Sequence, residues 1–134
     1  MLRTCSIALS AMVTCGLVTA QAADETLTLA CQGIGVSKFG ATDQPTQEAM
    51  SFGVIVNLTA RTVEGFPVWN LPVKVTAANQ AAIEFEGSET SGATLIRRLN
   101  GTIDRVTGGA WATFTMGPAV VNFSLKCRPT QRMF

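Results

Sequence analysis

The chain has 134 residues, a length that suits a single domain. Its ten basic and nine acidic residues give a formal charge of +1, so we expect no nucleic-acid partner. Histidine and tyrosine are both absent, which excludes a Ser-His-Asp triad, a Cys-His pair and a histidine metal site. We therefore predict that the protein is not an enzyme and that it uses no metal or cofactor.

Residues 1–22 have the three parts of a secretory signal peptide. Arg3 supplies the positive charge, an uncharged apolar run follows, and Ala20-Gln21-Ala22 offers small residues to a signal peptidase. The apolar run is shorter than the roughly 20 residues that span a bilayer. Cleavage after Ala20 and lipidation at Cys15 are the alternatives. We expect a periplasmic or secreted protein in which residues 23–134 form one β domain with no membrane span.

Cleavage after the signal peptide leaves two cysteines, Cys31 and Cys127. Only one intramolecular pair is then possible, and an oxidising compartment favours it. In the chain-entropy model, closing so long a loop stabilises a fold by about 4–5 kcal/mol. Two free thiols, or a redox or metal pair, fit less well because the cysteines lie at opposite ends of the domain. We predict a structural disulfide.

Alternation of apolar and polar residues predicts β-strands along the remaining chain, and helical periodicity is almost absent. The first and last of these strands carry Cys31 and Cys127 on their apolar faces. We therefore predict an all-β meander of about eight short antiparallel strands that closes into a barrel, with a strongly curved sheet or sandwich as the alternative. The polar segment Gly35–Ala49 is expected to be a long loop. The clearest alternation falls in residues 26–31, 52–59, 73–75, 83–86 and 120–127.

Three glycine-containing dipeptides predict turns between the later strands. They are Asn100-Gly101, Gly108-Gly109 and Gly117-Pro118. A two-residue turn at the first dipeptide would join oppositely charged and apolar side chains across the hairpin. The pairs expected from these turns are Arg97 with Asp104, Leu95 with Val106, Trp111 with Val106, and Phe114 with Ile103.

Charge is distributed unequally along the chain. Acidic residues dominate residues 23–91, whereas Asp104 is the only acidic residue of 92–134. Arg97, Arg98 and Arg105 are therefore a candidate face for an anionic partner, such as a lipid headgroup, a wall polymer or an acidic protein. The alternative is that acidic and basic strands lie side by side and neutralise each other.

The segment Phe66–Pro72 is a second candidate site. Its prolines, Pro67 and Pro72, confine it to a loop or a sheet edge. Phe66 and Trp69 are therefore placed either to contact a ligand or to plug one end of the barrel.

The segments Gly101–Gly108 and Leu125–Pro129, together with Phe134 at the end of the chain, resemble short uncharacterised secreted proteins of Gram-negative bacteria. The resemblance covers roughly the last third of the chain, the signal peptide and Cys31. No activity is assigned to that group, so the resemblance implies export and compactness only.

The leading functional hypothesis is a non-catalytic periplasmic binding or interaction module, because a disulfide-linked β scaffold lacks a catalytic constellation. One alternative is a small barrel that carries an apolar ligand. Another is a periplasmic inhibitor of a wall-degrading enzyme, since periplasmic lysozyme inhibitors are similar in size and β content. Its partner would be an anionic envelope component or a protein.

Overall fold

The computed structural model describes residues 25–130. The predicted signal peptide at 1–22, including Cys15, and the terminal Phe134 lie outside the described residues, so the expectations for them stay predictions. Within the described part, no helix is long and apolar enough to cross a membrane.

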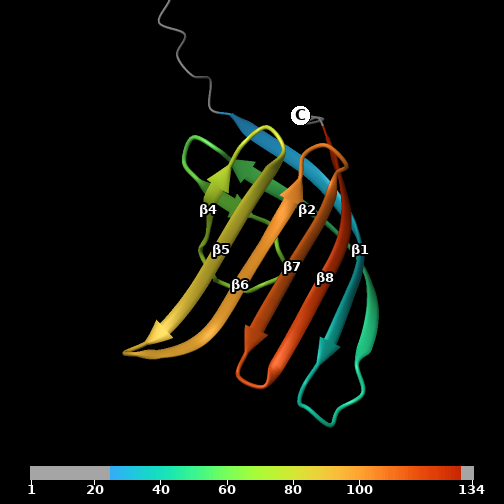
Figure 1. The fold of residues 1–134 in the computed structure, drawn as a ribbon, viewed down its shortest axis with the longest axis vertical. Coiled ribbons are helices and arrows are strands. Elements are labelled where there is room, and N and C mark those ends of the chain that lie inside the picture. Colours follow the sequence, from blue (N-terminus) through green and yellow to red (C-terminus); the bar gives the residue numbers. More distant parts are fainter. Residues whose placement is uncertain (1–24, 131–134) are drawn as a thin grey trace, which may run out of the picture.

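Eight antiparallel strands form a closed barrel in which each strand pairs with the next and the last pairs with the first (Figure 1). The predicted all-β meander barrel is confirmed. The strands are β1 (Thr26–Lys38), β2 (Thr46–Asn57), β3 (Thr62–Glu64), β4 (Val73–Ala78), β5 (Ala82–Ser91), β6 (Thr94–Asp104), β7 (Gly109–Met116) and β8 (Ala119–Pro129).

The period-2 alternation of the sequence sets which side chains enter the barrel. On β8, Phe123 and Leu125 are buried, whereas Asn122 and Ser124, which alternate with them, are exposed. Residues that pair directly across two strands share a face of the sheet, so the buried positions of all strands meet in one core. The fully buried large side chains are Val54, Val56, Ile83, Phe85 and Leu99.

The disulfide joins Cys31 of β1 to Cys127 of β8, as predicted. These residues lie directly opposite each other in the β1–β8 ladder, with Cα atoms 4.0 Å apart and a sequence separation of 96. Both cysteines are buried on the inner face of the sheet. The bond therefore closes the barrel where the first strand meets the last.

The long loop predicted for Gly35–Ala49 is wrong for most of its length. β1 continues to Lys38 and β2 begins at Thr46, so the connection contains only residues 39–45. Gly33, two residues before this segment, allows β1 and β8 to pair closely. A β-carbon at this position would lie 2.1 Å from the carbonyl oxygen of Ser124, so only glycine lets β8 approach so closely.

The turn predicted at Asn100-Gly101 is also wrong, because both residues lie inside β6. Gly101 faces Phe85, and its missing side chain leaves room for the Phe85 ring. The glycine therefore serves packing and not turn formation. The actual pairs are Arg97 with Glu89, Trp111 with Thr102 and Phe114 with Leu99.

The other two predicted turns lie close to real ones. Gly108, with a φ of 80°, ends the connection between β6 and β7, and Gly109 is the first residue of β7. Gly117-Pro118 forms the turn between β7 and β8, and Gly117 has a φ of 57°.

We expect Gly101→Ala to destabilise the barrel by about 1–3 kcal/mol. The added methyl group would lie 2.5 Å from the carbonyl oxygen of Trp111 and 2.6 Å from Cζ of Phe85. Gly53→Ala is the matched control, because its nearest neighbour would be 3.8 Å away and the change should be close to neutral. Urea unfolding of both variants measures the difference, and equal midpoints would contradict the packing role of Gly101.

Candidate functional site

The centre of the barrel is filled by an aromatic cluster. Phe66, from the loop between β3 and β4, inserts its ring among three phenylalanines of the wall. Its centroid lies 5.4 Å from Phe52, 5.0 Å from Phe85 and 6.1 Å from Phe123. Eight-stranded barrels have interiors just wide enough for side chains to fill, and here one loop residue completes the packing.

The loop that carries Phe66 is fastened to β6 by Arg97. The guanidinium group donates to the carbonyl oxygens of Trp69 and Asn70, the latter at 2.9 Å, and also pairs with Glu89. With its backbone held in this way, the loop directs Phe66 inward, while Trp69 is 87% exposed. The structure thus separates the two predicted aromatic residues: Phe66 plugs the barrel, and Trp69 faces solvent.

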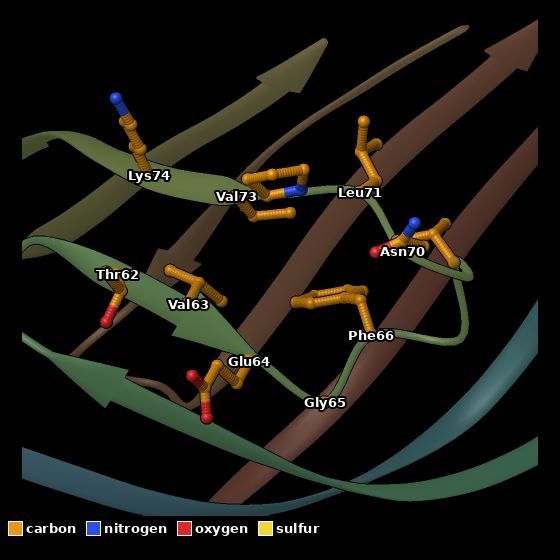
Figure 2. A pocket seen from close by; sticks show the side chains of 11 residues that line it. Thr62, Val63, Glu64, Gly65, Phe66, Asn70, Leu71, Val73 and Lys74 are labelled. Carbon is orange, nitrogen blue, oxygen red and sulfur yellow. The ribbon is translucent and has the colours of Figure 1, made fainter. Parts of the chain in front are cut away.

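A depression of about 400 Å³ lies between β3, this loop and β4 (Figure 2). Its walls are apolar, and Glu64, Asn70 and Lys74 stand around them. It offers room for a small apolar group beside the barrel wall. The apolar wall residues labelled in Figure 2 are Val63, Phe66, Leu71 and Val73.

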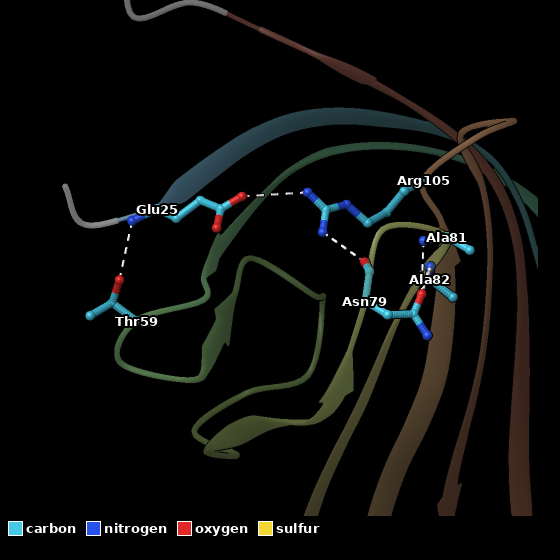
Figure 3. A network of polar contacts seen from close by, with 6 residues as sticks. All are labelled: Glu25, Thr59, Asn79, Ala81, Ala82 and Arg105. Carbon is cyan, nitrogen blue, oxygen red and sulfur yellow. Dashed lines mark hydrogen bonds and ion pairs between the residues drawn. The ribbon is translucent and has the colours of Figure 1, made fainter. Parts of the chain in front are cut away.

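At the opposite end of the barrel, a polar network joins two turns to Glu25, the residue before β1 (Figure 3). Arg105, in the β6–β7 turn, donates to the carbonyl oxygen of Asn79 at 2.8 Å and to Glu25 at 3.5 Å. Asn79 accepts the N–H groups of Ala81 and Ala82 at 2.8 and 2.9 Å and so shapes the β4–β5 turn. Arg105 is therefore occupied by partners within the protein.

An apolar hollow of about 220 Å³ opens at this same end of the barrel. Its polar side chains, Asp104 and Arg105, already bond to neighbouring parts of the chain. The hollow thus lacks an unengaged polar group that could orient a ligand. Its apolar lining consists of Leu27, Leu29, Ile83, Ile103, Cys127 and Pro129.

Asp104 fixes the β6–β7 turn. Its Oδ1 accepts the N–H groups of Val106 at 2.8 Å and Thr107 at 3.0 Å. These bonds favour the ionised carboxylate and hold the pKa of Asp104 below its ordinary value of 3.8, with a smaller contribution from the charge of Lys126.

We expect the negative charge of Asp104 to stabilise the fold near neutral pH and to lose this effect in acid. A carboxyl whose pKa is lower in the folded than in the unfolded chain stabilises the fold above its unfolded pKa and loses that effect as the pH falls through the folded pKa. Asp104→Asn keeps the acceptor oxygen but removes the charge. Wild type should therefore be the more stable at pH 7, and the difference should shrink as the pH falls below 3.8. Urea midpoints across this range provide the test, and a pH-independent difference would contradict it.

The three arginines of the predicted anionic-partner face do not come together. Arg97 and Arg98 are adjacent on β6 and point to opposite sides of the sheet, and Arg105 lies in the turn at the far end of that strand. Each one forms an ion pair with an acidic residue from the segment 23–91. The ion pairs are Arg97–Glu89, Arg98–Glu86 at 3.2 Å and Arg105–Glu25 at 3.5 Å.

The outer surface of β6, β7 and β8 carries a different group of side chains. Trp111 projects outward from the middle of β7 and is 53% exposed, between Thr102 of β6 and Ser124 of β8. The neighbouring row of the sheet is formed by Asn100, Thr113 and Asn122. We call these six residues the Trp111 face. A shallow depression of about 400 Å³ lies over them and extends to Val36 of β1.

Comparison with known protein families, with curated proteins and with solved structures gives no match. Among residues 25–130, no three His, Cys, Asp or Glu side chains come together in a group that could hold a metal ion. Function must therefore be inferred from the side chains of this chain alone.

Trp111 is not among the site residues predicted from the sequence. The two-residue turn expected at Gly108-Gly109 paired Trp111 with Val106, whereas the structure pairs Trp111 with Thr102. The useful signal is the run Ala110-Trp111-Ala112, in which two small residues alternate with a large one. Ala110 and Ala112 are buried, so the alternation places the indole on the outside.

Proposed function

We propose that the protein is an exported, non-catalytic binding module whose ligand lies on the Trp111 face. The observation that carries the proposal is a half-exposed indole among hydrogen-bonding side chains on a rigid sheet. Large aromatic side chains dominate binding energy at protein surfaces, and rigid elements hold them in place at little entropic cost. Export, which the predicted signal peptide supports, would place this face in the cell envelope or outside the cell.

The filled interior favours an outer site over a ligand chamber. An apolar ligand inside the barrel would have to displace Phe66, which packs against three other rings. The two apolar depressions lie at the barrel wall and at one barrel end. The carrier hypothesis therefore has less support than a binding surface.

A second candidate function is inhibition of an envelope enzyme through the loop between β3 and β4. Arg97 holds the backbone of this loop while Trp69 protrudes. A preorganised loop with an exposed aromatic tip suits insertion into the cleft of a partner protein. In that case Trp69, and not Trp111, would be essential for binding.

Co-sedimentation of the full chain with the insoluble envelope fraction of Gram-negative cells tests both candidates. We expect the wild type to sediment, Trp111→Ala to remain in the supernatant, and Trp69→Ala to behave as wild type. Loss of sedimentation only in Trp69→Ala would favour the inhibitor function. If the wild type stays in the supernatant, or if both variants sediment fully, the Trp111 face does not bind the envelope and the proposal fails.

A further inference from the structure

We propose that the ligand of the Trp111 face is an uncharged carbohydrate chain. This inference rests on the proposed function and deepens it by naming the class of ligand. Three features of the face support it. Its lining residues are uncharged, its hydrogen-bonding groups both donate and accept, and its indole is exposed in the middle of them.

The residues that line the depression carry no charge. Charged positions border it. Arg98 pairs with Glu86 on one side, and Glu84 lies beside Thr102 on the same strand as Glu86. On the other side, Lys126 donates to the carbonyl oxygen of Thr107 and lies near Asp104. A phosphate or a sulfate would therefore find no unengaged positive charge on this face, whereas an uncharged ligand needs none.

The hydrogen-bonding groups of the face can both donate and accept. Each hydroxyl group of Thr102, Thr113 and Ser124, and each amide of Asn100 and Asn122, has both capacities. Thr113 Oγ1 donates to Oδ1 of Asn122 at 3.0 Å, which fixes that amide and leaves its NH₂ group free to donate. The hydroxyl groups of a sugar also donate and accept. An array of neutral polar groups on strands about 4.8 Å apart suits a chain that repeats such hydroxyls.

The indole supplies the apolar part of the site. A pyranose ring presents C–H groups on its faces, and these pack against an aromatic ring. The ring of Trp111 extends over Gly109, where a β-carbon would lie 2.9 Å from Cη2 of the indole. Because Gly109 has no side chain, the indole can lie along the outer surface of β7.

A membrane or a peptide strand fits this face less well. Insertion into a lipid surface requires a broad apolar patch, whereas here polar residues surround a single indole. Addition of a peptide strand requires a free sheet edge, and the pairing of β1 with β8 closes the barrel.

The two tryptophans of the chain allow a direct test by fluorescence, with the full chain as the protein. Trp69→Phe leaves Trp111 as the only tryptophan, and Trp111→Phe leaves Trp69. The probes are cellotetraose, chitotetraose and maltotetraose, with tetragalacturonate as the anionic comparison. We expect at least one neutral tetrasaccharide at millimolar concentration to change the Trp111 emission with saturation, and to leave the Trp69 emission unchanged.

Variants of the face should weaken this binding in a defined order. We expect Trp111→Ala to weaken it by about tenfold or more and Asn122→Ala by about fivefold, with unfolding midpoints close to wild type. Gly109→Ala should lie between these variants and wild type, because the added methyl group displaces the indole without requiring a new backbone conformation. Trp69→Ala, the matched control, should bind as wild type does.

The inference is overturned if none of the neutral tetrasaccharides changes the Trp111 emission, if Trp69 responds in its place, or if tetragalacturonate binds as tightly as the neutral chains. Its failure can be told apart from failure of the proposed function. Envelope sedimentation that depends on Trp111 without any saccharide binding would retain the site and reject the carbohydrate. Sedimentation that does not depend on Trp111 would reject the site itself.

Discussion

Phe66→Ala is expected to lower the free energy of unfolding by about 3–5 kcal/mol. Only 8% of the residue is exposed, and its ring centroid lies 5.0 to 6.1 Å from those of three phenylalanines of the barrel wall. Removal of the ring would leave a cavity in the centre of the core.

Trp69→Ala is the control for this prediction because it alters an aromatic residue of the same loop. Trp69 is 87% exposed, so its loss should change stability by less than about 0.5 kcal/mol. Urea unfolding of the two variants and the wild type, followed by circular dichroism, gives the comparison. If Phe66→Ala unfolded at the same urea concentration as Trp69→Ala, Phe66 would not be the plug of the barrel.

The sequence predicts the strands correctly wherever one face of a strand is buried and the other is exposed to solvent. In the last strand, Phe123 and Leu125 alternate with Asn122 and Ser124, and this pattern alone fixes which side faces the core. The two cysteines then identify the strands that close the barrel, because both lie on the inner face.

The sequence misleads where glycine has two possible roles. Asn100-Gly101 has the composition of a tight turn, yet Gly101 lies in β6 to make room for Phe85. Gly33 similarly permits the close approach of β8 to β1. In both cases the cause is a residue distant in the chain, so local patterns could not reveal it.

The candidate sites, too, could be predicted only in part, because local patterns do not show which distant residues become neighbours. The two prolines placed Phe66 and Trp69 in a loop, but only the closed barrel shows that one ring enters it and the other does not. The charge asymmetry suggested a basic face, whereas the strand order places Arg98 beside Glu86 and Arg97 beside Glu89. Charge counted along the chain cannot show which strands become neighbours.

Removal of the disulfide is expected to lower the free energy of unfolding by about 4–5 kcal/mol in the chain-entropy model, given the sequence separation of 96 between Cys31 and Cys127. The loss should not be uniform across the barrel. The bond joins the first strand to the last, so its absence permits β1 and β8 to separate while the other strand pairs remain. Reduction of the wild type and the double variant Cys31→Ala/Cys127→Ala should give the same result, which separates the effect of the bond from that of the reductant.

Amide hydrogen exchange shows where the barrel opens. Ala30 and Arg128 form the pair next to the disulfide, whereas Leu99 is fully buried on β6, which pairs with neither β1 nor β8. After reduction, the amides of Ala30 and Arg128 should exchange earlier than that of Leu99, because local opening requires less free energy than global unfolding. Equal loss of protection at all three amides would mean that the disulfide stabilises the barrel as a whole. The closing pair of strands would then open only when the entire fold does.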